Sequence, residues 1–484
     1  MKCKRLLGLL LASMIVLTAT GCGNGKGTNN ESKTPGNESK VSGSESNAGQ
    51  EKEAVTISVG CMPDKDAKPE AYDAMVKQVE AFEKTYPWIT ITWDYSVFSA
   101  DTFMVKASTG QLPDFMFVPA TEPVRIIEAG YAADITDKME EYGYTTSVKK
   151  SILDSVTRDG KIYFIPYDSY TMGVIGNKTV FEEAGELDAN GNVVIPDTWE
   201  EVAELAKRIK EKTGKSGLAL PTVGGDGGWN FTNIAWSYGV EFMAEENGKW
   251  VAKFDSQEMV DALQFFSDLK WKYGAVSDNE LVEGSECQQL VSSGEAAMTL
   301  GIPAGWYAQK LSTLGMKPDE LIIGAMPGGP AGRYGLTGGS MYFVNPACTE
   351  AQQDACFKWV DFIGNGPEIT EETLKIKEAE TQAAIKEGKM VLPTVLATSY
   401  VSGNRAESLA ALYQKYANVD MSQLEDYIAG DVAIHVEEPR CAQDLYLTLS
   451  NLLQAVIIDK DADIKQLVSD AARDFQVNFL DNLE

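Results

Sequence analysis

The sequence predicts an α/β fold, and three observations support this prediction. Apolar residues alternate at 55–59 and again at 89–93, a pattern typical of strands. Between them, residues 75–82 place apolar side chains on one helical face, and this helix is expected to end at Tyr86-Pro87. A strand, helix and strand this close together form a parallel βαβ unit with a right-handed crossover. The apolar run at 114–118 predicts a third, buried strand.

Amphipathic helices are expected along the rest of the chain. Thr198 with Glu201 three residues later is a capping box, which places the start of a helix that continues to about residue 209. A second helix is predicted at 260–269, and two more lie near 441–457 and 463–480. Helices interspersed with strands in this way are typical of an α/β protein.

The N-terminal segment has the pattern of a secretory signal. Basic residues precede the apolar run 6–19, which is shorter than the about 20 residues that a membrane-spanning helix needs. The run leads into Ala19-Thr-Gly-Cys22, which resembles a bacterial lipobox, although the lipobox prefers leucine where Ala19 stands. The resemblance implies that residues 1–21 are removed and that Cys22 carries a diacylglycerol anchor.

Residues 22–53 are expected to form a flexible linker behind that anchor. The segment that follows Cys22 is rich in Gly, Asn, Ser, Lys and Glu and holds no aromatic residue, so it cannot bury enough apolar surface to fold. The whole chain has a formal net charge of −29, which argues against binding to nucleic acid or to anionic lipid headgroups.

The inventory of reactive residues excludes most catalytic classes. His435 is the sole histidine of the 484 residues, so histidine-rich zinc sites are excluded and a triad would have to use this one residue, which lies in an apolar stretch. Gly214-Lys-Ser216 lacks the first glycine of a P-loop, since Ile209 stands there, and Gly338-Gly-Ser340 lacks the closing glycine of a nucleophile elbow. Paired carboxylates remain available, so a glycosidase stays open. No metal or cofactor is predicted.

Short motifs along the chain, taken in order, resemble the family 1 extracellular solute-binding proteins of ABC sugar importers, which include the maltodextrin-binding proteins. They extend over nearly all of residues 54–484. The motifs are Phe82-Glu-Lys-Thr-Tyr-Pro87, Ala107-Ser-Thr-Gly110, Pro113-Asp114, Glu128-Ala-Gly130-Tyr131, Asp134-Ile-Thr-Asp137, Asp159-Gly-Lys-Ile-Tyr163, Glu183-Ala-Gly185, Pro196-Asp-Thr-Trp199, Ser293-Gly-Glu-Ala-Ala-Met298, Gly305-Trp306 and Met326-Pro-Gly-Gly-Pro330.

This resemblance implies a two-lobed clamp of the periplasmic-binding-protein kind, in which each lobe is a sheet flanked by helices. The chain would cross between the lobes three times, and the crossings together would form a hinge beside the ligand cleft. The expected crossings are 166–170, 328–339 and 393–403. The expected lobes are 54–168 with 336–398, and 169–335 with 399–484.

The predicted site combines aromatic platforms with carboxylates, because sugars present flat apolar faces and a belt of hydroxyls. Trp306 and Asp168 are placed in the cleft by the resemblance, and Glu122 by its position after the third strand. Trp229 is expected on a flexible glycine-rich loop, whereas Trp199 and Trp359 are expected in the core. The crossings add Tyr170, Gly339 and Ser340 to the predicted ligand-binding residues.

The resemblance implies a lipid-anchored receptor on the extracellular face of the bacterial cytoplasmic membrane, a monomer that hands a sugar to ABC permease subunits. The maltodextrin-binding members carry a Trp and an Asp-Arg pair after the third strand, where this chain has Val118, Thr121 and Glu122. An oligosaccharide other than maltose is therefore expected, and a non-sugar solute stays open. A surface carbohydrate-active enzyme with paired carboxylates and a sugar-sensing receptor are the alternative functions.

Overall fold

The first sheet begins with the βαβ unit that the sequence predicts. In the computed structural model, which describes residues 53–66, 69–277, 279–393, 402–429 and 432–483, β1 (Val55–Val59) pairs in parallel with β2 (Ile89–Trp93). Helix α1 (Pro69–Thr85) joins them, and β3 (Phe115–Pro119) lies parallel on the other side of β1. Cys22 and the predicted signal sequence lie outside the described residues.

The first lobe packs around this sheet. Its core contains Phe82, Phe164, Phe343 and Trp359, all almost fully buried, which confirms the predicted core position of Trp359. The remaining elements of this lobe are α2 (Ala100–Ser108), α3 (Pro123–Glu128), α4 (Thr136–Glu141), α5 (Tyr144–Ser147), α6 (Lys150–Ser155), β4 (Thr157–Arg158), β5 (Lys161–Ile162) and α13 (Glu350–Phe362).

A second sheet, of order β12-β7-β11-β8, carries the second lobe. Neighbouring residues of its strands point to opposite faces, so Val174 packs in one cluster of buried side chains and Ile175 in another. The strands are β7 (Gly173–Asn177), β8 (Ser216–Leu218), β11 (Ala296–Gly301) and β12 (Leu321–Gly324). Around them lie α7 (Lys178–Ala184), α8 (Trp199–Thr213), α9 (Gly224–Ser237), α10 (Gln257–Trp271), α11 (Gly284–Ser292), α12 (Gly305–Thr313), α17 (Ala442–Ile458), α18 (Ile464–Asn478) and the β9 (Met243–Glu246) and β10 (Lys249–Ala252) hairpin.

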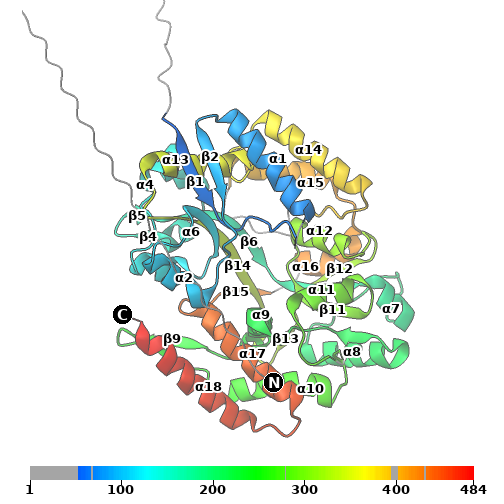
Figure 1. The fold of residues 1–484 in the computed structure, drawn as a ribbon. Coiled ribbons are helices and arrows are strands. Elements are labelled where there is room, and N and C mark those ends of the chain that lie inside the picture. The colour runs from blue at the N-terminus through cyan, green and yellow to red at the C-terminus, as the bar shows by residue number, and fades with distance from the viewer. Residues whose placement is uncertain (1–52, 67–68, 278, 394–401, 430–431, 484) are drawn as a thin grey trace, which may run out of the picture. The chain divides into compact units, whose positions relative to one another are not determined.

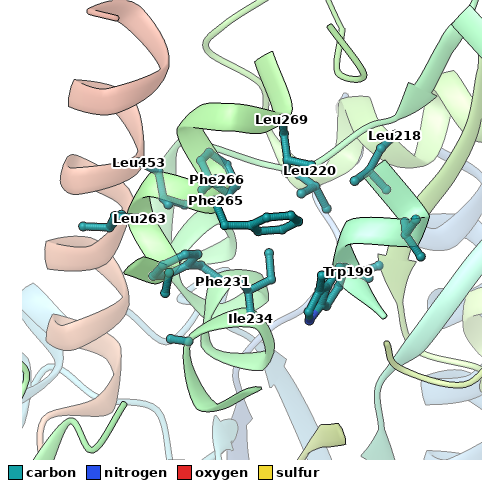
Figure 2. Close-up of a cluster of buried hydrophobic side chains, with 14 of the residues drawn as sticks. Trp199, Leu218, Leu220, Phe231, Ile234, Leu263, Phe265, Phe266, Leu269 and Leu453 are labelled. Atoms are coloured by element: carbon teal, nitrogen blue, oxygen red, sulfur yellow. The ribbon is translucent and has the colours of Figure 1, made fainter. Parts of the chain in front are cut away.

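The helices of the second lobe pack through the cluster shown in Figure 2. Phe265 of α10 points toward Trp199 at the start of α8, with ring centroids 6.4 Å apart, while Phe231 of α9 meets Phe266 edge to face at 5.8 Å. Leu453 brings α17 into the same cluster. Trp199 is fully buried, as predicted, and Thr198 caps α8 by accepting from the backbone N–H of Glu201.

Two long strands connect the lobes. β6 (Phe164–Thr171) and β14 (Gly332–Val344) are antiparallel partners and run between the elements of the first lobe and those of the second (Figure 1). Phe164 of β6 is part of the first core, whereas Met172, directly after it, is part of the second. β14 does the same in the reverse direction, with Leu336 in the second core and Met341 in the first.

The pairing register of these strands shifts between Ser340 and Met341, which marks a β-bulge. Met341 faces Pro166, a residue with no N–H to donate to the ladder. The first two expected crossings coincide with these segments. Residues 394–401 of the third lie outside the described part of the chain, and Met390 and Leu392 already pack in the second lobe, ahead of the expected boundary at 398. The lobe boundaries themselves stay a prediction.

Several of the remaining elements contact the second lobe. The remaining elements are β13 (Gly328–Gly329), α14 (Glu371–Lys386), α15 (Asn404–Tyr416), η2 (Met421–Gln423), α16 (Glu425–Ala429), β15 (Ala433–Val436) and η3 (Leu480–Asn482). Among them, η3 packs on α18, and η2 and α16 pack on β12. β15 pairs in parallel with Tyr334–Thr337 of β14. None of the helices within the described residues combines the length and the apolar character that crossing a membrane requires.

Candidate functional site

A cavity of about 320 Å³ lies where β6 meets the helices of the second lobe. Its wall combines aromatic rings with polar groups, among them Tyr170 of β6, Trp229 of α9, Trp306 of α12 and Tyr446 of α17. Three of the residues predicted from sequence therefore meet at one cavity: Trp306, Trp229 and Tyr170. Their contact with a ligand stays a prediction.

Glu122, Gly339 and Ser340 are not among the residues that line this cavity. Gly339 lies within the sheet, where its carbonyl accepts from the Ala120 N–H at 3.0 Å, and Ser340 is paired with Asp168 of β6. Glu122 is 5% exposed and precedes α3, where it accepts a hydrogen bond from Thr121. Burial raises the pKa of Glu122 to about 7, and nearby Arg125 partly opposes that shift.

Trp229 lies on a regular helix, which corrects the prediction of a flexible glycine-rich loop. A Cβ at Gly228 would overlap the carbonyl oxygen of Tyr446, and a Cβ at Gly227 would lie 2.7 Å from the hydroxyl of Ser450. The same hydroxyl accepts from the Gly228 N–H at 2.8 Å. The glycines therefore let the backbone of α9 approach both the backbone and the Ser450 side chain of α17, and this contact positions Trp229.

The cavity wall holds a carboxyl group that sequence analysis did not single out. Glu437 follows β15, and its Oε1 accepts from the Tyr446 hydroxyl at 3.0 Å. Trp229 also hydrogen-bonds to this carboxylate. Burial raises the pKa of Glu437 to about 7, and the two hydrogen bonds partly oppose the shift. The pair of donors fixes Trp229 and Glu437 relative to each other.

Gly338 of β14 lies close to both Tyr170 and Glu437, and its lack of a side chain leaves space for both of them. A Cβ there would lie 2.7 Å from both the Tyr170 hydroxyl and Glu437 Oε2. The ring of Tyr170 in turn meets Trp229 edge to face, with centroids 5.9 Å apart and planes at 81°. Of the two strands that join the lobes, β6 thus contributes the Tyr170 ring to the cavity. β14 leaves space for the Glu437 side chain, because Gly338 has no side chain.

Trp306 is an exposed aromatic residue of the wall. It lies in the first turn of α12, directly after β11, and is 51% exposed. Its ring meets Tyr307 edge to face at 5.7 Å, while Tyr307 itself is buried. A tryptophan face left in water at the edge of a cavity can stack on the apolar face of a sugar ring.

Buried acceptors with no partner complete the wall. Asn230 is 6% exposed, and its Oδ1 has no hydrogen-bond partner in the structure. The Oε1 atom of Gln288 is also buried and also lacks a hydrogen-bond partner. Leaving a buried acceptor unsatisfied costs about 1–3 kcal/mol, so a ligand group that donates a hydrogen to either atom would recover part of that cost. Within the described residues, no group of three or more His, Cys, Asp or Glu side chains is arranged to hold a metal ion.

The second cavity of note lies on the first lobe, between the end of β2 and α2. It measures about 520 Å³ and is lined by Trp93, Tyr95, Val97 and Lys106, among others. Tyr95 and Val97 are more than half exposed. This surface lies at the carboxyl end of a parallel strand, the edge at which open α/β sheets bind ligands.

Comparison with known proteins gives a consistent result. The family model described as bacterial extracellular solute-binding protein matches residues 65–365. Among curated relatives, the polygalacturonan/rhamnogalacturonan-binding protein YtcQ of Bacillus subtilis is 25% identical over 248 residues, 47% of this chain and 46% of the relative. The sn-glycerol-3-phosphate-binding protein UgpB of Agrobacterium fabrum is 31% identical over 178 residues, 35% of this chain and 39% of the relative. The chain thus spans less than half the length of these two relatives.

A solved structure with this architecture is MalE3 of T. maritima with bound maltose. It matches with a TM-score of 0.65 and 18% sequence identity, over 88% of this chain and 100% of that one. At this identity the likeness establishes the fold, a two-lobed clamp of α/β lobes.

Proposed function

Because the chain belongs to the bacterial extracellular solute-binding protein family, we propose that it captures a carbohydrate, as an oligosaccharide, between its lobes and delivers it to the membrane subunits of an ABC permease. One observation carries the proposal: aromatic faces and unsatisfied acceptors share a cavity beside the strands that join the lobes. Sugar hydroxyls donate hydrogen bonds to such acceptors, and sugar C–H faces cover such rings.

Two of the three named proteins support a sugar as the ligand. YtcQ is described by the pectic polysaccharides that it binds, and MalE3 was solved with maltose. Both aromatic and amide side chains of the present cavity suit that chemistry. A receptor of this kind needs no reacting group, and the family and its structural neighbours are binding proteins.

Ligand should close the two lobes on each other. β6 and β14 are the continuous connections within the described residues, and contacts from both lobes to one ligand form only in a closed state. We expect small-angle scattering to report a smaller radius of gyration when an oligosaccharide that binds by calorimetry is added at saturation. A trisaccharide that gives no heat of binding is the control. An unchanged radius with the saturating ligand would favour a rigid pocket over a clamp.

Cys22 is proposed to hold the protein at the outer face of the cytoplasmic membrane. A single acyl chain gives only marginal membrane binding, so the two chains of a diacylglycerol are what make retention durable. We expect the wild-type protein to fractionate with membranes, and Cys22→Ser to leave an uncleaved or differently cleaved precursor. Cys61→Ser, in the folded part, is the matched control and should change neither property. A wild-type protein wholly in the medium, with a mature N-terminus other than Cys22, would contradict the anchor.

A further inference from the structure

Asn230, in the wall of the cavity, has a hydrogen-bond acceptor without a donor partner. The Nδ2 of Asn230 donates to the Asp226 carbonyl at 2.8 Å, and a carbonyl can only accept. This contact fixes the orientation of the amide, so the atom left without a partner is the acceptor Oδ1. With 6% of the residue exposed, a ligand atom that reaches Oδ1 must bring a hydrogen to donate.

The charges of the cavity point in the same direction. Asp226 and Glu437 both line it, and among the lining residues Lys310 carries the one basic side chain. Burial raises the pKa of the Cys287 thiol to about 12, so that side chain adds no charge at neutral pH. Burial raises the pKa of Asp226, and the nearby positive charge of Lys310 partly opposes that shift, so the Lys310 ammonium already lies near a carboxyl group.

Two nearby arginines, Arg125 and Arg440, are already paired with carboxylates. Arg125 lies 3.7 Å from Asp444, and Arg440 donates to Glu128 at 2.8 Å. Glu122 adds a further carboxyl near Glu437. A carboxylate or phosphate on a ligand would therefore face carboxyl groups and acceptors, with no free guanidinium among these described neighbours to receive it.

We propose that the cavity selects an uncharged, hydroxyl-bearing sugar residue and rejects an acidic one. This inference rests on the proposed sugar-binding function and names the class of sugar. It sets the chain apart from two of its relatives, one named for polygalacturonan and the other for sn-glycerol-3-phosphate, both of which are anionic. A hydroxyl donates to Asn230 Oδ1, whereas an ionised carboxylate in its place can only accept.

The experiment compares sugars that differ only at their primary hydroxyls. Maltotriose and β-1,4-galactotriose are each titrated by calorimetry beside the same trisaccharide with its primary hydroxyls oxidised to carboxylates. We expect the oxidised form of whichever sugar binds to bind at least about tenfold more weakly, the change that repulsion of about 1.4 kcal/mol produces. Raising the salt concentration should narrow the gap, because salt screens the repulsion.

Two variants should relax the selection. The variants Asp226→Asn at the rim and Glu437→Gln in the wall are compared at about pH 8.5, above the raised pKa of Glu437 of about 7, so that each substitution removes a negative charge. Each is expected to improve binding of the oxidised sugar about tenfold with a smaller change for the neutral one. Gln keeps an acceptor oxygen for Tyr446. Glu211→Gln, an exposed residue of α8 away from the cavity, carries the same charge change and is the matched control. A gain of binding cannot arise from a misfolded variant.

The possible failures differ from one another. Equal or tighter binding of the oxidised sugar by the wild-type protein overturns the charge selection and leaves the sugar-binding function standing. Relaxation by Glu211→Gln as large as that by Asp226→Asn also overturns it, because the cause would then be overall charge. Failure of neutral and oxidised sugars alike to bind, in the wild-type protein and in both cavity variants, overturns the sugar-binding function together with the inference.

Discussion

Replacing Gly228 with alanine is expected to destabilise the protein by about 3 kcal/mol and to abolish ligand binding at the same time. The new Cβ would collide with the backbone of Tyr446 in α17, and backbone cannot escape by changing rotamer. The two helices would have to separate along the contact that also holds Ser450 against the Gly228 N–H. Trp229 and Asn230, the next residues of α9, would move with them.

Gly225→Ala is the matched control for this prediction. It lies three residues earlier in the same helix, and no atom lies within 4 Å of the position its Cβ would take. Alanine there is expected to be neutral or to stabilise by up to about 1 kcal/mol, since glycine is the poorer helix former. Thermal unfolding of both variants without ligand is the measurement. Equal melting temperatures would mean that the close approach of α9 and α17 contributes little.

Trp306→Ala is expected to weaken sugar binding by about 10- to 60-fold with little change in melting temperature. Its ring is 51% exposed, so stacking on a sugar can cover about 60–100 Å² of apolar surface. At about 25 cal/mol per Å² this contributes roughly 1.5–2.5 kcal/mol, and each 1.4 kcal/mol is a factor of ten in affinity. The measurements are calorimetric titration and thermal unfolding without ligand.

Trp359→Ala serves as the buried counterpart of that substitution. Trp359 is 3% exposed in the first core, where truncation should cost about 3–5 kcal/mol of stability. The folded fraction that remains should bind sugar normally. If Trp306→Ala instead lowered the melting temperature as Trp359→Ala does and kept its affinity, Trp306 would be a core residue and not a platform.

Local pattern was sufficient for much of the fold. Alternation at 55–59 and 89–93 placed two strands, and Thr198 placed the start of α8, because these features depend on neighbours a few residues apart. Asp159 and Gly160 also form a locally determined feature, since their positive φ angles of 52° and 76° make the tight turn between β4 and β5. The two-lobed arrangement came from resemblance and not from periodicity.

The glycines of α9 show where local pattern misled. A run of Gly224, Gly225, Gly227 and Gly228 is expected to favour a flexible loop, since glycine is costly within a helix. The helix forms because α17 packs directly against it, a contact more than 200 residues distant in sequence. Tertiary packing thus outweighs local propensity here.

The site could be predicted only in part for the same reason. Trp229, Trp306 and Tyr170 could be predicted as site residues from the motifs and from their residue types. Glu437 and Tyr446 reach the cavity by folding back from the C-terminal region, and nothing in the residues around Glu437 distinguishes it from other carboxyls of an acidic chain. The unsatisfied Oδ1 of Asn230 is a property of the packed interior and has no counterpart in sequence.

We expect this protein to bind a sugar without transforming it. Asp226 and Glu437 line the cavity, so cleavage by paired carboxyl groups is the activity that must be separated from binding. The most direct measurement is a calorimetric titration with maltotriose and β-1,4-galactotriose, followed by chromatography of the sugar recovered after prolonged incubation. Saturable binding of one sugar per protein and recovery of the trisaccharide at full length are the expected results. Steady release of shorter sugars, lost in Glu437→Gln, would contradict it.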